Sequence, residues 1–238
     1  MVSDGEVLRL AVIPARGGSK RIPRKNIKAF HGKPIMAYSI EAARNSGLFD
    51  EVMVSTDDEE IALIAERYGA SVPFFRSAET SGDHATTANV LLEVLENYRQ
   101  IERKFFHICC IYPTAPFITG EKLQKAFALL EESGADALVP VVAFSYPPLR
   151  GLTIHDDRLR MMWPENEAVR SQDLEPLYHD CGQFYFVRAG ALLEERTLFC
   201  RETVPMILPE LEVQDIDNET DWILAEQKYI LLKQSGRL

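Results

Sequence analysis

The sequence predicts an α/β fold in which a mostly parallel sheet is covered by helices. Short β-rich runs alternate along the chain with segments whose apolar residues recur at helical spacing, which is the order typical of βαβ units. The chain has 238 residues, of which 46% are hydrophobic and 26% are charged. A chain of this size and composition can bury its own core as one large domain.

The first two units carry the clearest patterns. The apolar run over 8–13 predicts a buried strand, and the helix expected over 34–46 has proline in its first turn and glycine just past its end. A strand is expected over 51–55. A second helix is expected next, because apolar residues recur there at helical spacing. It should begin after an aspartate cap, Asp57 or Asp58, and end at a glycine.

The later units follow the same rhythm up to residue 143. Between 144 and 178, proline, arginine and acidic residues accumulate without any long period. A stretch of this length is usually functional or an interaction element, and a plain surface excursion is the alternative. We therefore divide the chain into one domain, 1–238, with an inserted subdomain at about 144–178. The remaining strands are expected over 71–75, 105–111, 137–142, 182–187 and 203–208, and the remaining helices over 86–103, between Thr119 and Gly134, and over 221–235.

Composition excludes several classes of protein. No apolar stretch approaches the roughly 20 residues that span a bilayer, and the N-terminal residues lack the apolar core of a signal peptide. The four cysteines form no CxxC pair, so we expect no zinc site and a reducing, cytoplasmic location. The 26 basic and 36 acidic residues give a net charge of -10, which argues against nucleic-acid or membrane partners.

One segment, residues 16–28, has the opposite charge. It follows the first predicted strand, which places it at the carboxyl edge of the sheet, where such folds bind ligands. Gly17 and Gly18 allow a ligand to approach the backbone closely, and Ser19 adds a hydroxyl. Arginine and lysine side chains suit a polyphosphate, although most charge runs are simply solvated. The six basic residues are Arg16, Lys20, Arg21, Arg24, Lys25 and Lys28.

The spacing of this basic loop excludes the common phosphate-binding frameworks. It matches neither GxxxxGK[ST] nor GxGxxG, so a P-loop kinase is not expected. A triphosphate bound without either framework indicates nucleotidyl transfer, in which the loop neutralises the departing pyrophosphate. Asp215 and Asp217 alternate on an extended segment before the last helix, so their carboxylates point the same way and can hold magnesium. The alternative is that Asp217 or Asn218 merely caps that helix.

Five motifs, in order along the chain, resemble the sialic-acid-type cytidylyltransferases, the CMP-acylneuraminate synthetases. They are IPARGGSKRIPRKN (13–26), VSTDDEEIA (54–62), YPTAP (112–116), RSQDLEPLYHDCGQFYF (170–186) and DIDNETDW (215–222). The resemblance covers nearly the whole chain, and the first motif is highly specific.

The resemblance implies a three-layer, Rossmann-like nucleotide-diphospho-sugar transferase fold with helices on both faces of the sheet. It also implies that the chain transfers CMP from CTP to the anomeric hydroxyl of a nine-carbon sugar acid, with magnesium as cofactor and pyrophosphate as the second product. The segment 144–178 corresponds to the family's dimerisation excursion, which lends residues to the partner's active site, so a homodimer is expected.

The resemblance also assigns residues to the site. The nucleotide-binding positions are Ala15, Arg16, Gly17, Gly18, Ser19, Lys20, Lys25, Asn26, Arg76 and Asp83, and of these Arg16, Lys20 and Lys25 are expected to act in catalysis. The sugar-binding positions are Tyr112, Thr114, Arg170, Gln172, Tyr178, His179, Asp180, Gln183 and Tyr185. The magnesium-binding acids are Asp215 and Asp217. His179 could serve as a base or only contact the sugar.

Departures from the family pattern bear on the sugar. The N-acetylneuraminate enzymes usually read QPTSP at 112–116 and Asn-Gly-Ala at 181–183, where this chain has Tyr112 and the triplet Cys181, Gly182 and Gln183. Loss of those amide groups should change which sugar fits. The combination of motifs is most similar to the pseudaminic acid branch of the family. The alternatives are N-acetylneuraminate, legionaminate or Kdo as the sugar, or a nucleotide-binding module without catalysis.

Overall fold

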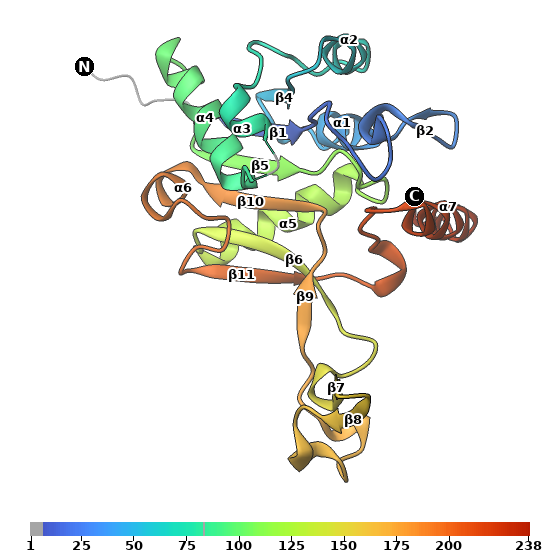
Figure 1. The fold of residues 1–238 in the computed structure, drawn as a ribbon. Helices are drawn as coiled ribbons and strands as arrows, with labels where there is room; N and C mark the ends of the chain where they lie inside the picture. The colour runs from blue at the N-terminus through green and yellow to red at the C-terminus, as the bar shows by residue number, and fades with distance from the viewer. Residues whose placement is uncertain (1–6, 83) are drawn as a thin grey trace.

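The computed structural model describes residues 7–82 and 84–238, and its centre is a seven-stranded sheet (Figure 1). The strands are β1 (Arg9–Pro14), β4 (Glu51–Ser55), β5 (His107–Ile111), β6 (Ala137–Ala143), β9 (Tyr178–Asp180), β10 (Phe184–Arg188) and β11 (Thr203–Ile207). Their order is β11-β6-β10-β5-β1-β4, and β9 pairs with β6 beside this path.

The sheet is mixed, although most of its strands run the same way. β1 is parallel to both β4 and β5, and β6 is parallel to β11. β10 is antiparallel to β5 and β6, and β9 is antiparallel to β6. The reversal follows from the chain path, because the chain leaves the sheet at the end of β6 and returns to the same edge through β9 and β10.

Helices cover both faces of the sheet, which confirms the predicted three layers (Figure 1). Successive strand residues point to opposite faces, so Ile13 belongs to the core of one layer and Val12 to the core of the other. The first layer contains α1 (Ile35–Asn45), α2 (Glu59–Arg67) and α5 (Gly120–Ser133), and the second contains α4 (Thr87–Gln100) and α6 (Ala189–Glu195).

The predicted helix caps are present. The carboxylate of Asp58, rather than that of Asp57, accepts from the amide of Ile61 at the start of α2. Thr86 and Thr119 cap α4 and α5 in the same way. Asn218 and Asp221 form a capping box on α7 (Glu219–Gln234), which covers the side of the molecule next to the basic loop.

The strand expected over 71–75 is wrong. Only Ser71 forms a bridge, to Met53 of β4, and the chain then leaves the sheet. Pro73 has no backbone N–H for a ladder, which explains why this β-rich run does not continue as a strand. Several short elements were not predicted. Before residue 144 they are the hairpin of β2 (Ala29–Phe30) and β3 (Lys33–Pro34) and the helix α3 (Ala78–Ser81). After it they include β7 (Leu152–His155), β8 (Arg158–Met161), β9 and α6.

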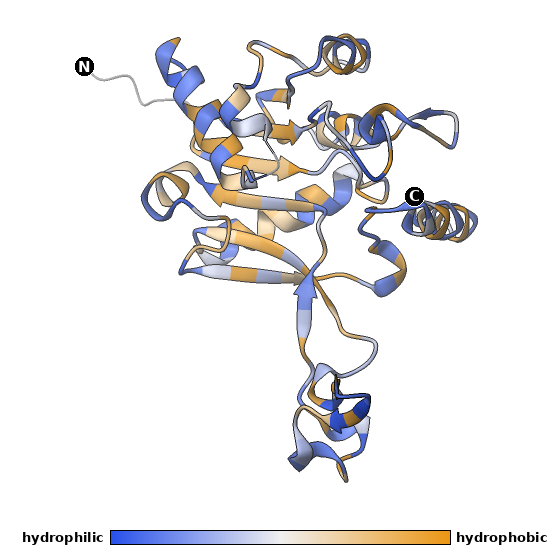
Figure 2. Ribbon diagram, in the orientation of Figure 1, coloured by the Kyte–Doolittle hydropathy of each residue, from blue (hydrophilic) through white to orange (hydrophobic). Residues whose placement is uncertain are grey.

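Residues 144–177 form an excursion that projects from the sheet between β6 and β9 (Figure 1). Its core is the hairpin β7 (Leu152–His155) and β8 (Arg158–Met161), flanked by short 3-10 turns. Hydrophobic and hydrophilic residues are mixed on it, whereas the inner sheet strands such as β1 and β6 are mainly hydrophobic (Figure 2). Ile154 of the hairpin is 72% exposed.

No helix in the described part of the chain is long and apolar enough to cross a bilayer.

Candidate active site

A cavity of about 460 Å³ opens at the carboxyl edge of the sheet. Three separate segments line it: the basic loop after β1, the turn after β5, and the acidic segment before α7. Nine of the residues predicted for the site line this one cavity, and Pro14, Arg21 and Pro113 line it as well. The nine are Arg16, Ser19, Lys20, Lys25, Asn26, Tyr112, Thr114, Asp215 and Asp217.

The N-terminal end of α2 holds the basic loop in place. The amide of Gly17 donates to Asp57 Oδ1 at 2.8 Å. The guanidinium of Arg24 donates to both carboxylate oxygens of Asp58, at 2.5 and 3.0 Å, and this pairing lowers the pKa of Asp58 to about 2. A Cβ on Gly17 would lie 2.8 Å from Asp58 Oδ2, so glycine is needed for this close approach.

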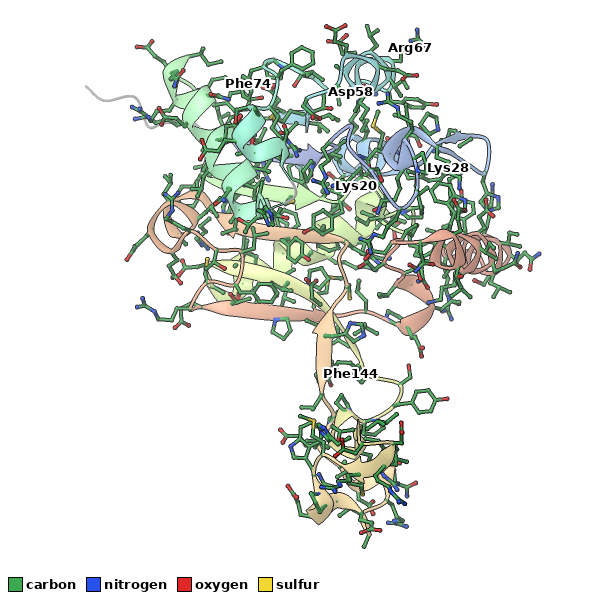
Figure 3. All side chains as sticks on the ribbon, in the orientation of Figure 1. Lys20, Lys28, Asp58, Arg67, Phe74 and Phe144 are labelled. Carbon is green, nitrogen blue, oxygen red and sulfur yellow. The ribbon has the colours of Figure 1, made fainter. Side chains whose placement is uncertain are left out.

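Within the loop, a buried asparagine supports the backbone. The side-chain amide of Asn26 donates to the carbonyl of Arg16 at 2.9 Å. Lys20 lies toward the middle of the molecule and Lys28 toward its outer edge beside α7 (Figure 3). Lys28 donates to both oxygens of Glu219 and lies 4.4 Å from the centroid of the Trp222 ring, outside the cavity. The loop therefore contains basic residues that face the cavity, one that binds α7 (Lys28) and one that binds the start of α2 (Arg24).

The acidic segment and the basic loop are in direct contact. The ammonium of Lys25 donates to the carbonyl of Ile216 at 2.5 Å and lies 3.7 Å from Asp217 Oδ1. Arg21 donates to the same oxygen of Asp217 at 2.8 Å. Burial lowers the pKa of Lys25, and the charges of the two aspartates oppose that change. Burial and the charge of Asp217 together raise the pKa of Asp215.

These two carboxylates suit a divalent cation that is shared with a ligand. Among the described residues, no group of three His, Cys, Asp or Glu side chains could hold a metal by itself. Mg²⁺, however, is usually bound by one or two protein carboxylates and completes its shell with waters and phosphate oxygens. A cation would also relieve the repulsion that raises the pKa of Asp215. The donor set therefore fits magnesium bound together with a triphosphate.

Arg76, another residue predicted to bind the nucleotide, is attached to the end of β4. Arg76 donates to the hydroxyl of Ser55 at 3.1 Å and to its carbonyl at 2.6 Å, and burial lowers the pKa of its guanidinium. The same carbonyl accepts from the amide of Ala15 at 2.9 Å, which joins Arg76 to the start of the basic loop. Asp83 lies outside the described residues.

Tyr112, which lines the cavity, is connected to two other predicted sugar-binding residues, Tyr185 and Asp180. The hydroxyls of Tyr112 and Thr87 are 2.8 Å apart, and burial raises the pKa of Tyr112 to about 12. The rings of Tyr112 and Tyr185 meet edge to face at 5.6 Å between centroids. The hydroxyl of Tyr185 donates to Asp180 Oδ2 at 2.5 Å, so this oxygen of Asp180 already has a partner within the chain.

A second cavity, of about 400 Å³, adjoins the first and shares Asp215 and Asp217 with it. His179 lines this second cavity, and its Nδ1 lies 2.9 Å from the carbonyl of Asp180. The sequence did not single out the other polar residues on its walls, which are Ser145, Glu210, Gln214, Asp221 and Lys228. Of these only Asp221 belongs to a motif, DIDNETDW, and no site role was assigned to it.

Six of the nine predicted sugar-binding residues line neither cavity: Arg170, Gln172, Tyr178, Asp180, Gln183 and Tyr185. Gln183 is only 1% exposed, and its amide donates to the carbonyl of Glu212 at 2.5 Å rather than facing either cavity. Arg170 and Gln172 lie on the excursion, where Arg170 pairs with Asp173, and Tyr178 begins β9. Within one chain these residues do not reach the cavity.

Comparison with known proteins identifies the family. Residues 10–214 match the family described as cytidylyltransferase. A pseudaminic acid cytidylyltransferase of Campylobacter jejuni subsp. jejuni is 42% identical over 231 residues, which cover 95% of this chain and 98% of that protein. The CMP-N,N'-diacetyllegionaminic acid synthase of Legionella pneumophila subsp. pneumophila is 35% identical, covering 92% of this chain and 94% of that protein.

Among solved structures, that of CMP:2-keto-3-deoxy-manno-octonic acid synthetase complexed with CTP aligns with a TM-score of 0.67. The alignment covers 95% of this chain and 99% of that one at 17% sequence identity. At this identity the likeness shows the fold alone, and that fold is the one the sequence predicts.

Proposed function

The chain belongs to the cytidylyltransferase family, and we propose that it transfers CMP from CTP to the anomeric hydroxyl of pseudaminic acid. One observation carries the proposal: the basic loop and the acidic pair, about 190 residues apart in the sequence, line one cavity. That arrangement suits a triphosphate whose leaving group is pyrophosphate.

The basic residues of the cavity neutralise the charge that develops on the leaving group. The sugar hydroxyl attacks the α-phosphorus of CTP, and the bond from that phosphorus to the bridging oxygen breaks. Arg16, Lys20 and Lys25 bind the β- and γ-phosphates and stabilise the departing pyrophosphate. The loop amides around Ser19 orient the phosphates, because α2 anchors the loop through Asp57 and Asp58.

Asp215 and Asp217 hold a magnesium ion in this proposal. When bound, the ion withdraws charge from the phosphate oxygens, which makes the α-phosphorus easier to attack. Lys25 and Arg21 hold the carboxylate of Asp217 in place at the wall of the cavity.

The sugar acid occupies the side of the site next to the second cavity. His179 lines that cavity, and the two aspartates lie on the boundary between the cavities, where a hydroxyl of the sugar would meet the α-phosphate. The relative at 42% identity acts on pseudaminic acid, and the relative at 35% identity makes a legionaminic acid product. The higher identity favours pseudaminic acid.

The excursion makes the protein a homodimer in this proposal. Exposed apolar residues on its hairpin, such as Leu152 (56% exposed) and Ile154 (72% exposed), offer a surface for a second copy. In the dimer, Arg170 and Gln172 reach the partner's site. The four cysteines are buried and free, which is consistent with a cytoplasmic enzyme.

A substrate panel tests the proposal. Pyrophosphate release is measured with CTP, Mg²⁺ and each of four sugar acids: pseudaminic, N-acetylneuraminic and N,N'-diacetyllegionaminic acids and Kdo. We expect the highest kcat/KM with pseudaminic acid. A higher value with any of the other three would refute the sugar assignment, and no release with any of them would refute the activity.

A further inference from the structure

The segment that carries the two aspartates has almost no regular structure of its own. Between β11 and α7 the chain forms only one short 3-10 turn, η5 (Glu210–Glu212), before it reaches Asp215 and Asp217. Both aspartates nevertheless line the two adjoining cavities. Side chains from other elements must therefore fix the segment.

The first tether is a buried ion pair. Lys122 of α5 lies 2.9 Å from Glu212 Oε2 and also donates to the carbonyl of Phe117 at 2.8 Å. The two paired side chains are only 11% and 17% exposed. Burial lowers the pKa of Lys122, and the carboxylate of Glu212 acts in the opposite direction. Burying two charges costs free energy that their attraction offsets only in a well-fixed geometry, so the pair specifies one position for Glu212.

Two further tethers hold the same turn from other elements. The amide of Gln183, on the approach to β10, donates to the carbonyl of Glu212 at 2.5 Å. Lys228 of α7 donates to the carbonyls of Val213 at 2.7 Å and Glu210 at 3.2 Å. The turn is thus attached to helices on two sides and to the sheet, and Glu212 is held through both its side chain and its backbone.

The far end of the segment is tethered as well. Lys25 donates to the carbonyl of Ile216, and the side chain of Ile216 is fully buried. Asp215 lies between this contact and Glu212. It follows Glu212 by three residues, so about 10 Å of extended chain separates the two. Asp215 lies beside Gly182, where an added Cβ would be in ordinary contact with Asp215 Cγ at 3.7 Å.

We propose that Lys122, Glu212 and Gln183 are positioning residues that hold Asp215 and Asp217 in the geometry that binds the divalent cation. None of the three lines either cavity. They act on the cation only through the aspartates. Without them the segment is no longer fixed in advance, so part of the free energy of cation binding is used to order it, and the affinity falls. The inference rests on the proposed function, in which these aspartates hold the metal.

The test measures cation affinity separately from turnover. Mn²⁺ is titrated calorimetrically into the protein with CTP and without sugar, for wild type and for Glu212→Gln, Gln183→Leu and the double variant Lys122→Met with Glu212→Leu. We expect the dissociation constant for Mn²⁺ to rise by roughly 10- to 100-fold in each variant. Lys125→Met is the control, because Lys125 is an exposed lysine on the same helix, whereas Lys122 is the one paired with Glu212.

Thermal unfolding without metal distinguishes positioning from a merely structural role. Glu212→Gln leaves a buried ammonium without its carboxylate and could fail to fold. The double variant removes both charges, and such replacements often leave stability unchanged. Unchanged Mn²⁺ affinity in the folded double variant and in Gln183→Leu would overturn the inference, even if the melting temperature fell. Turnover of wild type with the sugar panel decides the proposed function separately.

Discussion

Replacing Lys25 with methionine isolates the role of one cavity lysine from the general charge of the basic loop. Methionine has nearly the same length but no charge, so the substitution removes the ammonium that lies between Ile216 and Asp217. Lys28→Met is the matched control. Lys28 belongs to the same loop, but it is engaged by Glu219 and the Trp222 ring outside the cavity.

The structure sets the expected size of the two effects. Lys25 is largely buried and would donate a charge-assisted hydrogen bond to a phosphate, which is worth about 1.5–3 kcal/mol. This corresponds to a loss of roughly 10- to 150-fold in kcat/KM. Lys28 lies outside the cavity, and its partly exposed pair with Glu219 contributes about 0–1 kcal/mol to stability, so its loss should leave kcat/KM nearly unchanged.

The assay is continuous pyrophosphate release with CTP as the varied substrate. Circular dichroism and the melting temperature of both variants establish that each is folded. Equal losses of kcat/KM in Lys25→Met and Lys28→Met would refute the reasoning, because the loop would then act through its total charge. A negligible loss in Lys25→Met would do the same.

Three further predictions concern the supports of the site. Asp217→Asn should lower kcat/KM at least 100-fold, and a chelator should abolish wild-type turnover until Mg²⁺ is restored; chelator-resistant turnover would remove the metal from the mechanism. Gly17→Ala should lower the melting temperature, because its Cβ would lie 2.8 Å from Asp58 Oδ2, whereas Gly18→Ala meets nothing within 4 Å and should leave it unchanged. Asp58→Asn keeps a capping side chain but loses the charge paired with Arg24, and should cost about 1 kcal/mol of unfolding free energy near neutral pH. Because the folded pKa of Asp58 is lowered to about 2, that difference should disappear as the pH falls from 3.8 toward 2, and a difference that persisted in acid would contradict the assignment.

The main parts of the candidate site were predictable because each follows from a local rule. The basic loop had to lie at the carboxyl edge once residues 8–13 were identified as a strand. The aspartates alternate on an extended segment, so their shared direction could be inferred from the spacing of Asp215 and Asp217. The structure brings the two segments together in one cavity.

The supports of that site were not predictable, because they are contacts between distant residues without a pattern. Gln183 and Glu212 are 29 positions apart and meet through a side chain and a carbonyl. Lys122 is one of several charged residues on α5, and no periodicity distinguishes it from the exposed Lys125. The reversal of β10 depends on where the excursion returns to the sheet, which its irregular sequence does not specify.

The measurement that tests the central claim most directly follows the phosphorus atoms of CTP. The protein is incubated with pseudaminic acid, Mg²⁺ and CTP labelled either in the α- or in the γ-phosphate, and the products are separated. Nucleotidyl transfer predicts that the α-label appears in a CMP-sugar and the γ-label in pyrophosphate. A γ-label on the sugar, or both labels remaining in CTP, would contradict the account.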